Sequence, residues 1–173
     1  MLRPIRAYVR FVDKLNTIVG KFAMMLIFLM MGILLCESIS RTFFDTPHIW
    51  TMESAQFTMA AYYMLGGGFS LLLRAHVRMD VLYSRWFTKT KAKVDRFTIF
   101  FMIFYLVVLL YGGLSSASYS LEYGQHNHTA WAPPLAPIKI IMVIGIILML
   151  LQAVATFFKD MAKARGESEE EWS

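Results

Sequence analysis

The sequence predicts an all-α membrane protein with four transmembrane helices, and three observations lead to this fold class. Hydrophobic residues make up 57% of the 173 residues, which leaves no room for a large soluble domain beside the membrane part. Four apolar runs are each long enough to cross about 30 Å of hydrocarbon as helices. Nearly all basic residues lie on one side of these runs, as in membrane proteins with a fixed orientation.

The N-terminal element, at about residues 2–19, is predicted to be an amphipathic helix on the inner membrane surface. Apolar residues recur there at helical spacing, while charged residues occupy the other faces. The first span follows at about 21–41. It should stay attached to the chain, because its apolar run is too long for the hydrophobic part of a cleaved signal peptide.

The other three spans are predicted at about 52–74, 97–121 and 138–158. Together with the N-terminal element they form a single four-helix membrane domain of residues 1–165. The remaining segment, 166–173, is acidic and is predicted to be a disordered tail.

The orientation follows from the basic residues. Fifteen of the seventeen lysines and arginines lie in the N-terminal segment, in the connection between the second and third spans, and after the fourth span. Only Arg41 and Lys139 lie on the other side. The positive-inside rule therefore places both termini in the cytoplasm.

Several function classes lack the residues that they need. The net charge of +5 comes from basic residues beside apolar runs, so it does not indicate nucleic-acid binding. Cys36 is the one cysteine, which excludes an internal disulfide and a zinc cluster of cysteines. Motifs for nucleotide binding, zinc proteolysis and hydrolysis are missing, and no histidine lies at mid-membrane depth to hold haem. We therefore expect no catalytic residue, metal or cofactor, and no enzyme activity.

Glu37 is the one carboxylate inside a predicted span. Such a group is a functional candidate because it is costly in hydrocarbon. Arg41 lies one helical turn further on, however, and an ion pair between the two explains Glu37 without transport chemistry. The structural interpretation is favoured.

Trp50 and Glu53 stand at the start of the second span. Tryptophan suits the membrane–water interface, and a carboxylate is favoured at the positive end of a helix dipole. A contact with a partner protein explains both residues equally well, so two interpretations stay open.

Four polar residues follow the second span: Arg74, His76, Arg78 and Asp80. If the helix continues, the residues four apart share a face. The His/Asp pair could bind metal or relay protons, but two ligands do not make a site. We favour hydrogen bonds to neighbouring helix ends, with the arginines meeting lipid phosphates on the cytoplasmic side.

The outer connection carries His126, His128 and Trp131. Alternation in an extended segment places the two histidines on one side. Without a third ligand, a solvated loop is favoured over a metal site. The prolines that follow impose an extended path and direct Trp131 to the outer interface.

The residues also match a known pattern. Trp50-x-x-Glu53, a glycine step at Gly66-Gly67-Gly68, and the exit Ala75-His-Val-Arg-Met-Asp80 resemble the small membrane subunit of TRAP (tripartite ATP-independent periplasmic) transporters. The segment from Trp131 to Lys139 resembles the branch called mannitol/chloroaromatic-type. The similarity covers about residues 10–160. One departure is Met52, where many family members have a first glutamate.

The resemblance implies a function. A small TRAP subunit braces a larger multi-span permease in the bacterial inner membrane, a periplasmic solute-binding protein delivers an organic acid, and a sodium gradient drives uptake. The polar motif residues and the glycine triplet would then contact the partner or support the scaffold.

Two competing functions remain from the residues alone. One is an autonomous small exporter that exchanges protons for a cation at Glu37. The other is the membrane anchor of a redox enzyme, for which haem-binding residues are missing.

Overall fold

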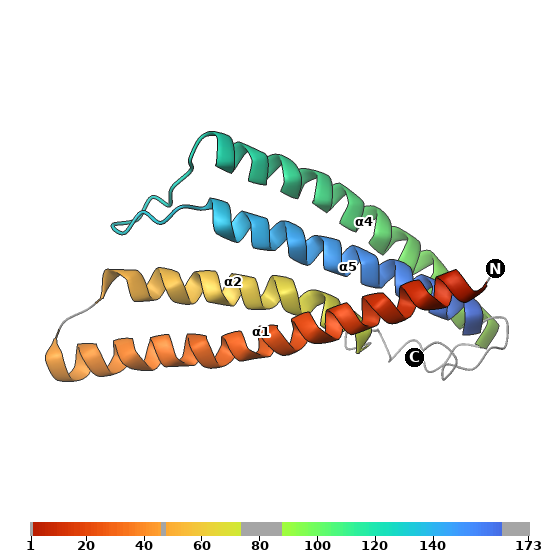
Figure 1. The fold of residues 1–173 in the computed structure, drawn as a ribbon, viewed down its shortest axis with the longest axis horizontal. Coiled ribbons are helices and arrows are strands. Elements are labelled where there is room, and N and C mark those ends of the chain that lie inside the picture. The colour runs from red at the N-terminus through yellow and green to blue at the C-terminus, as the bar shows by residue number, and fades with distance from the viewer. Residues whose placement is uncertain (1, 46–47, 74–87, 164–173) are drawn as a thin grey trace.

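The computed structural model describes residues 2–45, 48–73 and 88–163. This part of the chain is built from four long helices (Figure 1): α1 spans Leu2–Phe44, α2 Ile49–Leu72, α4 Thr88–Glu122 and α5 Ala136–Lys163. The all-helical fold class is confirmed. The acidic segment 166–173 and the candidates Arg74, His76, Arg78 and Asp80 lie outside the described residues.

The helices form a fanned layer in the order α1, α2, α5, α4 (Figure 1). α2 lies between α1 and α5, and α4 packs at the edge against α5. The N-terminal part of α1 also reaches α5, where Val9 and Val12 are buried against Ala155 and Ala162. Each helix therefore keeps a large surface for lipid or for another protein.

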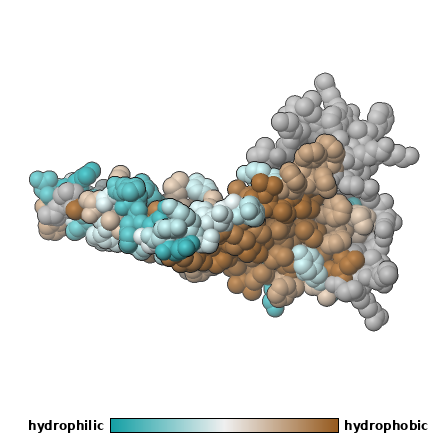
Figure 2. Space-filling view, turned by 90° about the horizontal axis from the view of Figure 1, so that it is seen from above, coloured by the Kyte–Doolittle hydropathy of each residue, from teal (hydrophilic) through white to brown (hydrophobic). Residues whose placement is uncertain are grey.

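Most of that surface is apolar. Phe22, Met25 and Phe28 of α1 and Phe97 and Phe104 of α4 are all more than half exposed. Figure 2 shows the apolar surface over the body of the molecule, with hydrophilic residues gathered toward one end. Lipid is the solvent that suits such a surface, because exposed apolar patches of this size are rare on water-soluble monomers.

Three of the helices contain segments long and apolar enough to cross a membrane: Ile5–Phe44, Phe97–Glu122 and Ala136–Ala162. α2 is not among them. Its 24 residues nevertheless extend over about 36 Å. The crossing by α2 stays a prediction.

The predicted amphipathic helix and the first predicted span belong to one continuous helix, α1, of 43 residues. Gly20 lies at their junction without breaking the helix. Its missing side chain leaves room for the Phe69 ring of α2, which a β-carbon on Gly20 would overlap. Whether residues 2–19 lie on the membrane surface stays a prediction.

Candidate functional site

Four polar side chains connect α1 to α5. Asn16 and Gln152 are each 1% exposed. Asn16 Nδ2 donates hydrogen bonds to Gln152 Oε1 at 2.8 Å and to the Val12 carbonyl at 3.2 Å. Gln152 Nε2 donates to Asp13 Oδ1 at 3.0 Å, and Lys159 Nζ to Asp13 Oδ2 at 2.5 Å. We call Asp13, Asn16, Gln152 and Lys159 the α1–α5 network.

The network also reaches α2. Asn16 Oδ1 is buried without a conventional hydrogen-bond donor, and it lies against Gly68, where a β-carbon would collide with it. The missing side chain of Gly68 thus makes room for the Asn16 amide beside the α2 backbone. Buried polar groups bonded in this way fix the arrangement of the helices, since breaking one bond leaves its partner unpaired. We did not predict this network from the sequence.

The glycine triplet of α2 divides into two roles. A β-carbon on Gly67 would lie 2.7 Å from Met149 Sδ of α5, and one on Gly68 would meet Asn16. Gly66, by contrast, has nothing within 4 Å of its β-carbon position. α5 contributes its own close approach, since a β-carbon on Gly145 would lie 2.6 Å from the Met64 carbonyl oxygen. Two glycines of the triplet thus serve packing inside the chain, and the third faces outward.

Glu37 acts at the start of α2. Its Oε2 accepts hydrogen bonds from Thr51 Oγ1 at 2.9 Å and from the backbone N–H of His48 at 3.3 Å. His48 is the N-cap residue of α2 and makes no side-chain cap bond. The carboxylate of α1 therefore takes the place of a cap, at the positive end of the α2 dipole. The expected pair with Arg41 is wrong, because the start of α2 offers Glu37 two donors.

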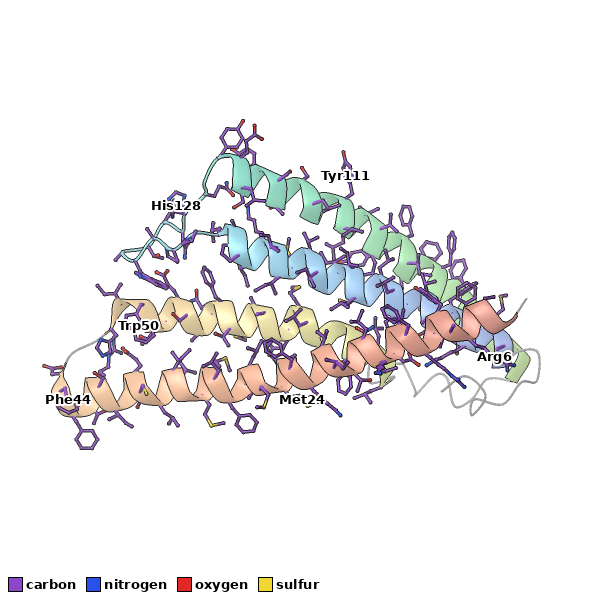
Figure 3. All side chains as sticks on the ribbon, in the orientation of Figure 1. Arg6, Met24, Phe44, Trp50, Tyr111 and His128 are labelled. Carbon is purple, nitrogen blue, oxygen red and sulfur yellow. The ribbon has the colours of Figure 1, made fainter. Side chains whose placement is uncertain are left out.

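Trp50 and Glu53 differ in position. Trp50 is 45% exposed, with its ring 6.1 Å from that of His48, and Figure 3 shows it at the end of α2 beside the α1–α2 connection. Glu53 is only 6% exposed, and its Oε2 has no hydrogen-bond partner among the described atoms. The first turn of α2 contains no acidic residue, so Glu37 supplies the charge that we expected from Glu53.

The outer connection folds back on itself. The Asn127 amide donates to the Pro133 carbonyl at 2.9 Å, and His126 Nδ1 lies 3.0 Å from the Ala132 carbonyl oxygen. His128 is exposed at this end of the molecule (Figure 3), and Trp131 is 47% exposed. Within the described ranges, no three His, Cys, Asp or Glu side chains come together as metal ligands.

Lys139 holds the outer connection in place. From the first turn of α5, its Nζ donates to Gln125 Oε1 at 2.6 Å and to the Ser116 carbonyl of α4 at 3.3 Å. The ammonium thus joins α4, α5 and the segment between them. The sequence showed Lys139 only as an exception to the charge rule.

Comparisons with known proteins identify the chain. A search of curated proteins finds no match. A family model described as "Tripartite ATP-independent periplasmic transporters, DctQ component" matches residues 30–163, which is well over half of the chain. That range includes the C-terminal part of α1 and the whole of α2, α4 and α5. The resemblance drawn from the sequence motifs is therefore confirmed, and the chain belongs to the DctQ family, the small membrane component of TRAP transporters.

Proposed function

We propose that the chain is a non-catalytic scaffold subunit of a sodium-coupled importer of organic acids. It braces the large permease subunit and works with a periplasmic solute-binding protein in the bacterial inner membrane. The observation that carries the proposal is membership of the DctQ family, whose members work with a large permease and a solute-binding protein.

In this proposal all four helices cross the membrane and both termini lie in the cytoplasm. The distribution of the basic residues supports this orientation. Trp50 beside the α1–α2 connection and Trp131 in the α4–α5 connection are both exposed. Tryptophan is enriched at membrane–water interfaces, so these two residues support placing both connections at the outer interface. Arg74 and Arg78 then meet phospholipid headgroups on the cytoplasmic side.

The scaffold role is supported by what the buried polar groups do. The α1–α5 network and the Glu37 carboxylate connect helices of the chain to one another. In a transport site, by contrast, polar groups must be able to bind the solute instead of one another. An exporter that uses Glu37 would have to give up the contacts that fix the start of α2, so no observation favours that alternative.

The test is to solubilise the native membrane gently, capture this chain, and identify its companions by mass spectrometry. We expect a larger polytopic permease in fixed proportion. Liposomes containing this chain alone should take up no organic acid, whereas the complex with its binding protein should do so only with a sodium gradient. Recovery of this chain alone as a stable oligomer, or uptake by this chain alone, would contradict the proposal.

A further inference from the structure

One face of α2 is left uncovered by the described parts of the chain. Its positions follow one another at intervals of four and three residues: Met52, Gln56, Met59, Tyr63 and Gly66. Met52 is 71% exposed and Tyr63 60%. We call these five residues the α2 stripe. Because α1 and α5 cover the other sides of α2, the stripe is the part of this helix available to something outside the chain.

Gln56 is the residue of the stripe whose polar side chain is unfavourable in contact with lipid. It lies seven residues after Ile49, where α2 begins, which is about 10 Å along the axis. A helix about 36 Å long exceeds the hydrocarbon layer by only a few ångströms at each end, so Gln56 lies within that layer in the proposed topology. Its amide has two N–H donors and a carbonyl acceptor, and none has a partner among the described residues.

Exposed polar side chains on the apolar parts of α1 and α4, among them Ser38, Ser115 and Tyr105, each carry a single hydroxyl and no amide. Ser118 of α4 is exposed, but its hydroxyl donates to the Ser115 carbonyl of its own helix at 2.9 Å. Tyr111 of α4 is 79% exposed, yet its phenol has a single hydroxyl on a large apolar ring. An exposed amide therefore marks the α2 stripe as the face that needs a polar partner.

Gly66 indicates what kind of partner fits this face. Since nothing lies within 4 Å of its β-carbon position, a neighbouring helix can approach the α2 backbone closely there. Intervals of four and three residues also define the seam along which two helices pack at a shallow angle. The stripe thus offers a second helix a polar anchor at Gln56 and a close contact at Gly66.

We propose that a membrane helix of the large permease subunit covers the α2 stripe and hydrogen-bonds the Gln56 amide. The inference rests on the proposed function, because it takes the large permease to be the companion of this chain. Lipid packs instead against Met25 of α1 and Phe104 of α4, whose exposed side chains are apolar.

The first experiment places a photoreactive phenylalanine analogue at one position at a time in the assembled complex in its native membrane. The stripe is probed at Met59 and Tyr63, and the matched controls are Met25, Phe104 and Tyr111. We expect the crosslink to the permease from both stripe positions and only lipid adducts from Met25 and Phe104. Crosslinks to the permease from the control positions alone would overturn the proposal.

The second experiment removes the anchor without changing the size of the side chain much. Gln56→Leu should reduce the permease that co-purifies with this chain about threefold to tenfold, as expected for the loss of one hydrogen-bonded side chain between membrane helices. The melting temperature of the isolated chain should stay the same or rise, because Gln56 has no partner within it. Tyr111→Phe serves as the control and should change neither quantity.

The outcomes separate the two claims. If the unmodified chain recovers no permease, the proposed function and this inference both fail. If it recovers permease, but Gln56→Leu retains normal recovery and the stripe positions give no crosslink, the inference alone fails. If Gln56→Leu lowers the melting temperature of the isolated chain, Gln56 is a packing residue and the inference also fails.

Discussion

The α1–α5 network and the α2 stripe place side-chain amides in opposite situations. Asn16 and Gln152 are buried, and the Asn16 amide N–H donates a hydrogen bond to Gln152 Oε1. Gln56 is exposed, with no partner among the described residues, and in the proposed topology it lies at a depth where water is scarce. The bonds of the network are made within one chain, whereas we propose that the stripe finds its partner in a second chain. The comparison teaches that the partners of a polar group in a membrane helix, rather than its presence, indicate what it does.

Removing the charge at the centre of the network should have the largest effect. Asp13→Leu leaves the Lys159 ammonium and Gln152 Nε2 without their acceptor, and breaking such a pair costs about 2–4 kcal/mol when it is largely shielded from solvent. Unfolding of the purified complex in detergent, followed by heat or denaturant, measures the loss. Glu122→Gln at the exposed end of α4 is the control, and equal stability of the two variants would show that the network contributes little.

Alanine at two neighbouring glycines sharpens the comparison within one helix. Gly68→Ala should destabilise the chain by about 1–3 kcal/mol, because the new methyl group collides with Asn16 and disturbs the network. Gly66→Ala should be neutral or stabilise α2 by up to about 1 kcal/mol, because its β-carbon meets open space. Thermal unfolding of the isolated chain compares the two. If Gly66→Ala were the more destabilising variant, Gly66 and not Gly68 would be the glycine packed inside the chain.

Lys139→Met tests whether the outer connection depends on the ammonium. The substitution removes the donor to Gln125 and Ser116 while keeping an unbranched chain, so we expect a loss of about 1–2 kcal/mol. The change should be local. Hydrogen exchange should increase at the amides of Asn127 and Leu135, whose bonds close the outer connection. Unchanged exchange at both amides would contradict this role.

Glu37→Gln should have the smallest effect. An amide oxygen still accepts bonds from Thr51 and His48, so the substitution removes only the charge at the helix end, worth about 0.3–1 kcal/mol. Solute uptake by the assembled complex should persist. Loss of uptake with normal assembly would instead favour proton exchange at Glu37, and this measurement therefore separates a capping carboxylate from a transporting one.

The agreement between sequence and structure is uneven along the chain, for a physical reason. Helix positions follow from local properties, namely apolar length and the residues that end each run. α4 and α5 therefore contain the predicted segments 97–121 and 138–158, and each helix extends beyond its segment. α2 is the exception, because it is not among the helices apolar enough to be candidate membrane spans. The family also followed from local motifs, since Trp50-x-x-Glu53 and the glycine triplet are short sequence patterns that occur in a fixed order along the chain.

The polar contacts could not be predicted in the same way. Asn16 and Gln152 are 136 residues apart, and each alone is only a polar residue in an apolar helix. For Glu37 the neighbouring Arg41 was the obvious partner in sequence, yet the folded chain places Thr51 and His48 within reach. Glu53 was expected to complement the start of the second span or to contact a partner protein, and the folded chain buries it.

The sequence by itself determined the helical fold class and the family, and it predicts the orientation. These depend on composition and on spacing along one segment, which a single helix carries with it. Only the tertiary structure decided which polar groups are paired inside the chain and which face of α2 is left open. Those outcomes depend on how α1, α2 and α5 cross, and a helix crossing brings together residues whose distance in sequence gives no indication that they meet.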